Sequence, residues 1–257
     1  MNFPLFDLHN HLLPLIDDGP NSMDETIKIV ELSEMQGVRT ILATPHKKDV
    51  NELHSIEFVR DLLKKVNQIC KSRGYSISLK LGMENHLDSR LLDDIKAGKA
   101  LPMGDSKYIL LEMPYDRKSN LVEDVLGQIQ KIGLIPLIAH PERMELFQYD
   151  PGLLFNLVDE GMLTQITASS VYGKFGDEVQ RFTEQILRCN LGHILASDAH
   201  MSTGPRPPDL LKGYFEVSKI IGRDAAKDMV STLPGAILEN NALDINCLLY
   251  TSPSPRD

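Results

Sequence analysis

The stretch FPLFDLHNHLLPLIDDG, residues 3–19, shows how this chain is organised. Residues 3–8, which are apolar except for Asp7, are typical of a short buried strand, and His9 and His11 follow at the end of that strand. Because side chains alternate along a strand, both imidazoles should point to the same side. Asp17 and Asp18 come a few residues later, before a glycine. The stretch therefore predicts a cluster of cation ligands where the first strand ends.

The remainder of the chain repeats the order of strand and helix. Apolar runs of β type lie at 3–8, 38–43, 77–82, 107–113, 134–139, 163–167 and 193–197. Helical patterns lie at 22–36, 54–73, 88–97, 120–132, 151–160, 174–189 and 208–221. This alternation predicts one α/β domain with a parallel sheet, which is either a closed barrel or an open doubly wound sheet.

Composition excludes several classes of protein. The net charge of −9 argues against a nucleic-acid partner, because proteins that bind nucleic acid usually carry a basic face. The chain has no apolar run of about eighteen residues and no signal-peptide pattern, so we expect no membrane insertion. The three cysteines lie far apart and form no paired motif. This cysteine usage is typical of a reducing compartment, and we expect a cytoplasmic protein.

The last eleven residues, CLLYTSPSPRD at 247–257, differ from the rest. They are rich in Ser and Pro, and they resemble a translated transposon-end adapter of the kind used in sequencing libraries. We therefore expect a non-native tail at 247–257 and a domain that spans 1–246.

Six of the seven predicted strands end in a residue that can bind a cation. These residues are His9, His11, His46, Glu84, Glu112, His140, Asp198 and His200. The carboxyl ends of parallel strands meet on one face, in a barrel and in an open sheet alike. Histidine and carboxylate without thiolate suit Mn, Fe or Zn, and so many ligands exceed the needs of one ion.

The other candidates are weaker. We expect His54, within a helical stretch, and His193, at the start of a strand, to lie outside the site. We also leave His86 outside the ligand set. Because DDG is a common turn sequence, spacing alone does not decide between Asp17 and Asp18 as a ligand.

Taken in order, the motifs DLHNHLLP, IDDGP, ATPH, GME, AHPER and SDAH resemble the PHP (polymerase and histidinol phosphatase) superfamily. More narrowly, they are similar to the metal-dependent protein-tyrosine phosphatases of bacterial capsule and exopolysaccharide operons. The resemblance covers roughly residues 5–240 and implies a distorted, TIM-like (β/α)7 barrel with three cations, usually Mn. It implies three ligand sets: His9, His11, Glu84 and Asp198; Glu84, Glu112 and His140; Asp18, His46 and His200.

The resemblance also implies a reaction. Arg143 and Arg206 would bind the phosphoryl group of a phosphotyrosine protein, such as the tail of a bacterial tyrosine kinase. No cysteine here has an arginine six residues further on, so the motif of the thiol phosphatases is missing. The resemblance implies the metal route instead, in which a hydroxide that bridges two metals would attack phosphorus. Asn10 and the pair Lys47 and Lys48 depart from the family pattern, and we expect them to affect substrate preference.

Two other functions remain open from the sequence. The first is a PHP phosphoesterase that acts on a small molecule such as histidinol phosphate. The second is a non-catalytic, metal-binding regulatory module that docks a kinase tail. The intact ligand set argues against the second function, because docking alone does not need these ligands.

Overall fold

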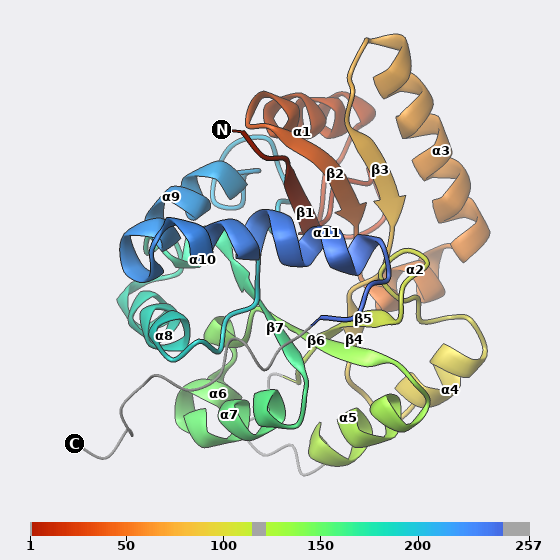
Figure 1. Ribbon diagram of the computed structural model, residues 1–257. Coiled ribbons are helices and arrows are strands. Elements are labelled where there is room, and N and C mark those ends of the chain that lie inside the picture. Colours follow the sequence, from red (N-terminus) through yellow and green to blue (C-terminus); the bar gives the residue numbers. More distant parts are fainter. Residues whose placement is uncertain (1, 115–121, 244–257) are drawn as a thin grey trace.

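The computed structural model describes residues 2–114 and 122–243, so the tail predicted at 247–257 lies outside the described residues (Figure 1). The strands are β1 (Leu5–Asn10), β2 (Val38–Ala43), β3 (Ser78–Leu81), β4 (Asn85–His86), β5 (Tyr108–Glu112), β6 (Ile135–Ala139), β7 (Leu163–Thr167) and β8 (Ile194–Ala196). The helices are α1 (Met23–Met35), α2 (Lys47–Leu53), α3 (Ile56–Ser72), α4 (Leu91–Lys96), α5 (Val122–Lys131), α6 (Glu145–Tyr149), α7 (Pro151–Asp159), α8 (Asp177–Arg188), α9 (Leu210–Ile221), α10 (Arg223–Lys227) and α11 (Leu233–Leu238). Short 3-10 helices at Pro141–Arg143 and Ala168–Ser170 and a π-helical turn at Asp228–Thr232 complete the described elements.

All strand pairs are parallel, as the alternating pattern predicts, but they form two sheets. One sheet has the order β1-β2-β3 and the other has the order β4-β5-β6-β7-β8. The strand pairing therefore confirms the parallel α/β arrangement but not the closure of seven strands into one sheet, which stays a prediction. The chain from 78 to 86 passes from the first sheet to the second, and Gly82 lies at the transition. A Cβ atom there would lie 2.9 Å from Leu42 Cδ2, so a larger residue would require the Leu42 side chain to shift.

Backbone hydrogen bonds join the two sheets at both of their edges. At one edge, the His11 N–H donates to the Ala199 carbonyl at 2.9 Å, and the Asp198 N–H donates to the His9 carbonyl at 2.8 Å. At the other edge, the Lys47 N–H donates to the Glu84 carbonyl at 2.9 Å. These bonds lie beside the predicted ligands, so the carboxyl ends of both sheets share one face.

An inner apolar core lies between the strands. Six strands each contribute a fully buried side chain to it, namely Leu8, Leu42, Leu110, Leu137, Leu163 and Ile194. Ile237 of α11 joins the same cluster, and α11 lies across the strands in Figure 1. Just beyond α11, the Asn241 carbonyl accepts a hydrogen bond from the Tyr108 hydroxyl at the start of β5. The chain after α10 therefore covers the amino ends of the strands and leaves the carboxyl ends for the site.

Candidate metal centre

The structure brings the predicted ligands together at the carboxyl ends of the strands. Except for Asp18 and His46, each predicted ligand exposes no more than 3% of its surface. The ligands come from loops and strands that lie far apart in the sequence. Two of them, His140 and Asp198, have left-handed backbones with φ of 32° and 53°. Such a conformation is uncommon outside glycine and is often found at functional sites.

The two β1 histidines meet the Glu84 carboxylate. Their Nε2 atoms lie 3.1 Å apart, as the alternation of side chains predicts. Glu84 Oε2 lies 3.3 Å from His9 Nε2 and 3.2 Å from His11 Nε2. Asp198 Oδ1 is a little further away, at 3.5 Å from His9 and 3.6 Å from His11. These four residues form the first predicted set.

A second group surrounds the other oxygen of Glu84. Glu84 Oε1 lies 2.9 Å from His140 Nε2, which is also 3.7 Å from Glu112 Oε1. Glu84, Glu112 and His140 can place one ligand atom each within 4.8 Å of one another. Glu84 therefore lies between the first and second predicted sets.

The third group contains Asp18, whose Oδ1 lies 3.0 Å from His200 Nε2 and 3.5 Å from His46 Nε2. Asp17 instead turns away from this group. Its Oδ2 lies 2.7 Å from His11 Nδ1 and accepts the His46 N–H at 3.1 Å. The geometry thus places Asp18 among the candidate ligands and Asp17 behind a histidine, which the spacing of DDG left open. Sequence analysis also missed Gln165, whose Oε1 lies 2.7 Å from His9 Nδ1.

The electrostatics of the cluster are strongly perturbed. Burial lowers the pKa of a histidine, but the Asp17 and Glu84 carboxylates together outweigh burial and raise the pKa of His11 to about 9. Burial together with the charge of His11 lowers the pKa of His200 to about 4. Burial raises the pKa of a carboxyl, yet the neighbouring imidazoles hold the pKa of Glu84 well below its usual range. The Glu84 carboxylate therefore remains charged and needs positive partners.

Both predicted arginines reach this cluster. Arg143 Nη1 lies 2.5 Å from Asp198 Oδ2, and Arg206 Nη2 lies 2.9 Å from Asp198 Oδ1. The Arg143 guanidinium also lies 4.5 Å from the centre of the Phe175 ring, which limits its movement. Arg206 Nη1 contacts Asp18 Oδ2 at 3.2 Å. The structure therefore places two guanidinium groups at the edge of the candidate ligand cluster.

The remaining histidines divide as follows. His54 stacks on Phe58 at 5.3 Å, and His193 Nδ1 accepts the Thr164 N–H at 3.1 Å, so both lie away from the cluster as expected. His86 does not lie outside it. Its Nε2 lies 2.8 Å from Glu112 Oε2, and His46, His86 and Glu112 can place one ligand atom each within 4.8 Å of one another, so His86 lies beside the predicted ligands. Strand alternation gives the signal, because Glu84 and His86 are two residues apart and share a side.

The residues that depart from the family pattern point away from the cluster. The Lys47 ammonium is buried and lies 3.2 Å from Asp88 Oδ2 and 2.8 Å from Asp94 Oδ2. The buried Asn10 side chain donates to Asp7 Oδ2 at 3.0 Å. These contacts give no support to a direct role of Lys47 or Asn10 in substrate preference.

The donor set fits several divalent cations. It offers imidazole and carboxylate groups from converging strands, and His11, Asp18, His46 and His200 form a further group that places ligand atoms within 4.8 Å. Such oxygen and nitrogen donors suit Mn, Fe or Zn, and the charge of a cation would satisfy the buried carboxylates. The residues therefore fit a centre with more than one metal ion.

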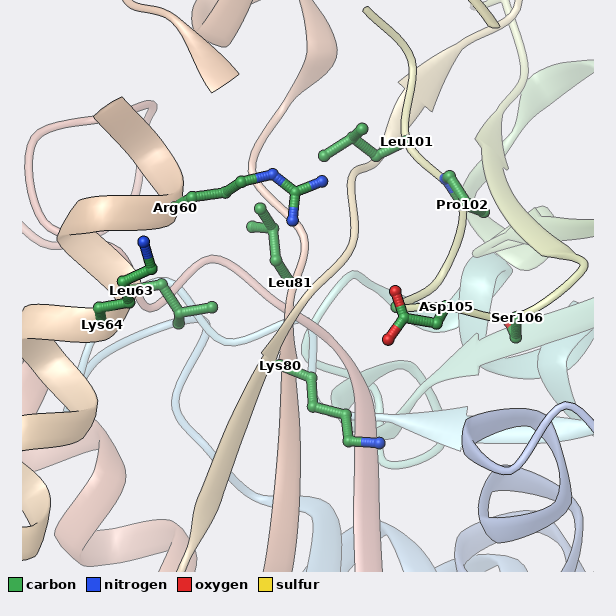
Figure 2. Close-up of a pocket in the computed structure, with 10 residues that line it drawn as sticks. Arg60, Leu63, Lys64, Lys80, Leu81, Leu101, Pro102, Asp105 and Ser106 are labelled. Atoms are coloured by element: carbon green, nitrogen blue, oxygen red, sulfur yellow. The ribbon is translucent and has the colours of Figure 1, made fainter. Parts of the chain in front are cut away.

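The structure also contains a separate pocket (Figure 2). It has a volume of about 590 Å³ and lies between α3, β3 and residues 101–106. Arg60, Lys64 and Lys80 line it together with Asp105, and Figure 2 shows these side chains around its opening. None of the candidate ligands lines this pocket, so it is distinct from the cluster.

The strands of this chain are parallel, and a cluster of His and carboxylate side chains lies at their carboxyl ends. These features are typical of α/β proteins that hold several cations at one end of a sheet. The chain belongs to the capsular polysaccharide synthesis family CpsB/CapC, whose pattern matches residues 5–239.

Two relatives illustrate this family. The tyrosine-protein phosphatase YwqE of Bacillus subtilis (strain 168) is 34% identical over 196 residues, which cover 76% of this chain and 77% of YwqE. The tyrosine-protein phosphatase CpsB of Streptococcus pneumoniae is 28% identical over 239 residues, which cover 91% of this chain and 98% of CpsB.

Solved structures agree with the family. One reported for YwqE from Bacillus subtilis and CpsB from Streptococcus pneumoniae, described as metal-dependent tyrosine phosphatases, matches with a TM-score of 0.85. It is 29% identical and covers 93% of this chain and 96% of that chain. A β-aspartyl dipeptidase from Fervidobacterium islandicum AW-1 matches at 14% identity with a TM-score of 0.55, which concerns the fold alone.

Proposed function

We propose that this chain is a metal-dependent protein-tyrosine phosphatase. The observation that carries the proposal is the cluster itself, in which Glu84 lies between candidate ligands from both sheets while Arg143 and Arg206 reach its edge. Its relatives YwqE and CpsB are named tyrosine-protein phosphatases, and they cover most of this chain. Family, donor set and arginines support the same reaction class.

The proposed cation ligands are those of the three predicted sets. They are His9, His11, Asp18, His46, Glu84, Glu112, His140, Asp198 and His200. Cations in such a site lower the pKa of water, which then acts as a nucleophile, and they neutralise charge on phosphoryl oxygens. We propose three ions and Mn²⁺ as the resident metal, with Fe and Zn compatible with the same donors.

The chain's own residues would position the phosphate. The guanidinium groups of Arg143 and Arg206 carry several N–H donors in a planar fork, which matches two oxygens of a phosphoryl group. Both groups lie within 3 Å of Asp198 and hence next to the candidate ligands. The phenol of tyrosine has a pKa near 10, so its phenolate leaves more readily than an alkoxide. Tyrosine phosphate therefore needs less help from a general acid.

We further propose the biological setting that the family implies. The substrate is a phosphotyrosine protein, namely the tail of a bacterial tyrosine kinase that controls capsule or exopolysaccharide synthesis. The three separated cysteines support a cytoplasmic location. Among the described residues, no helix combines the length and apolar character that crossing a membrane requires.

We also propose that the fold is a distorted (β/α)7 barrel. The proposal counts β3 and β4 as one interrupted strand, since only residues 82–84 separate them. The hydrogen bonds between the sheets at both edges and the inner core shared by six strands support it.

The test is hydrolysis of a phosphotyrosine peptide by purified protein, first with EDTA and then with Mn²⁺, Zn²⁺ or Mg²⁺ restored. We expect EDTA to abolish turnover and Mn²⁺ to restore it. His140→Ala should lower kcat by several orders of magnitude, whereas the matched variant His54→Ala should keep the wild-type rate, because His54 lies away from the cluster.

Two outcomes would contradict this proposal. Activity that survives complete chelation would remove the role of the cations. Hydrolysis of histidinol phosphate, with no hydrolysis of phosphotyrosine under any metal, would assign the chain to the small-molecule phosphoesterases of the same fold.

A further inference from the structure

We infer that Phe175 is a positioning residue, whose ring holds the Arg143 guanidinium in the orientation that receives a phosphoryl group. This role rests on the proposed function, because it assumes that Arg143 binds phosphate beside the cations. Phe175 lies in the segment between β7 and α8, outside the motifs that carry the family resemblance. It is therefore a further residue of the phosphate site.

Buried hydrogen bonds fix the start of this segment beside Arg143. Glu142 Oε1 accepts the Thr167 N–H at 2.9 Å and the Ser170 hydroxyl at 2.7 Å. Each of these three residues exposes no more than 1% of its surface. Because Glu142 and Arg143 belong to the same 3-10 helix, the two bonds tie this helix to the residues that follow β7.

Backbone hydrogen bonds close the rest of the segment into a compact loop. The Gly173 N–H donates to the Ser170 carbonyl at 3.2 Å, and the Gly176 N–H donates to the Gly173 carbonyl at 3.1 Å. Gly173 and Gly176 have φ of 81° and 94°, a conformation that glycine adopts at no steric cost. Phe175 lies between these two glycines, so the closed loop fixes the position of its backbone.

The Arg143 guanidinium contacts two side chains of different kinds. Its Nη1 lies 2.5 Å from Asp198 Oδ2, and its central carbon lies 4.5 Å from the centre of the Phe175 ring. Asp198 is a candidate ligand, so a bound cation would compete with Arg143 for its oxygens. Phe175 offers no ligand atom, so its attraction for the guanidinium does not depend on cation occupancy.

An aromatic ring restrains an arginine without using its hydrogen-bond donors. The ring attracts the positive charge of the guanidinium but accepts no strong hydrogen bond, so the N–H groups remain available to phosphoryl oxygens. The Arg143 side chain is only 17% exposed, and Phe175 is half-buried, so neither group has much room to move. Phe175 can therefore hold Arg143 in place while its donors face the substrate.

The experiment measures the binding of two anions that are not hydrolysed, inorganic phosphate and phenylphosphonate, to the Mn²⁺-loaded protein by isothermal titration. Three variants are compared with the wild type, namely Phe175→Leu, Phe175→Tyr and the matched control Phe155→Leu, whose residue is 40% exposed on α7. We expect Phe175→Leu to weaken the binding of both anions by about 3- to 10-fold, because leucine has no aromatic face. Phe175→Tyr keeps that face and should bind both anions like the wild type, as should Phe155→Leu. Mn²⁺ affinity should be the same in all four proteins.

Several results would overturn this role of Phe175. Wild-type phosphate affinity in Phe175→Leu, or a wild type that binds no phosphate, would remove it. A loss confined to phenylphosphonate would make Phe175 a contact for the substrate ring instead. An equal loss in Phe175→Tyr, or weaker Mn²⁺ binding in Phe175→Leu, would indicate a damaged loop. Phosphate binding that depends on Phe175, in a protein that does not hydrolyse phosphotyrosine, would contradict only the proposed function.

Discussion

Gly19 allows the loop that carries Asp17 and Asp18 to pack closely against the backbone of His11. A Cβ atom at this position would lie 2.1 Å from the His11 carbonyl oxygen and 3.0 Å from Asp17 Oδ1. Gly19→Ala must therefore displace backbone, and we expect a loss of about 1–3 kcal/mol in the free energy of unfolding. Because Asp17 supports His11 and Asp18 faces His200, Mn²⁺ affinity should fall as well. Urea unfolding and Mn²⁺ titration measure the two effects.

The matched control is Gly127→Ala within α5. A Cβ atom there has no neighbour within 4 Å, so the substitution should raise the free energy of unfolding by about 0.5–1 kcal/mol and leave Mn²⁺ binding unchanged. Wild-type stability and affinity in Gly19→Ala would show that the loop adapts without disturbing the site.

The candidate ligands were predictable residue by residue because their chemistry and their place at strand ends coincide. The roles of Asp17 and Asp18 were not, since both belong to one turn and only the three-dimensional path separates them. The position of His86 beside Glu112 was not predictable for a similar reason. His86 follows the predicted strand end, and its contact with Glu112 depends on β4, which two residues form by pairing with β5.

At the scale of elements, Lys47 connects the start of α2 to the segment that follows β4. Its ammonium is buried between Asp88 and Asp94, which are 37% and 20% exposed. Lys47→Met would leave these two carboxylates without a cation, and we expect a loss of about 1–3 kcal/mol in the free energy of unfolding. The loss should stay below that of a fully buried pair, because water reaches both carboxylates.

Urea unfolding of Lys47→Met and of Lys48→Met checks this prediction. Lys48 is the exposed neighbour, so its substitution should change stability by less than about 0.5 kcal/mol. Equal stability for both variants would mean that the buried ammonium adds nothing, as a well-packed apolar replacement sometimes shows.

The order of strands and helices was predictable because most elements are long enough to show a periodic pattern of apolar residues. The short elements were not predictable in this way. α2 presents only Lys47 and Val50 as buried residues, too few to show a helical period, and its residues fall between two predicted elements. The predicted strand at 77–82 contains β3 but ends before β4, because neighbours in space, rather than local pattern, decide where the ladder changes partner.

At the scale of the whole molecule, the cluster joins the two sheets. His9 belongs to the first sheet, Glu112 to the second, and Glu84 lies between them. Cations that bind all three residues would hold the two sheets together. The three residues lie close to one another only in the folded chain, so these cations would bind the folded state alone. A ligand that binds the folded state alone stabilises it, by about 2.7 kcal/mol when its free concentration is a hundred times its Kd. For a chain of this size, we expect Mn²⁺ to raise Tm by roughly 5–10 °C above the value in EDTA.

Thermal unfolding with EDTA and with Mn²⁺ measures this shift in the wild type, in Glu84→Gln and in His54→Ala. Glu84→Gln removes the carboxylate that contacts histidines of both sheets, so its Tm should respond little to Mn²⁺. His54→Ala should respond like the wild type, because His54 stacks on Phe58 away from the cluster. A wild-type Tm that Mn²⁺ leaves unchanged, or an equal rise in Glu84→Gln, would mean that cations do not join the two sheets.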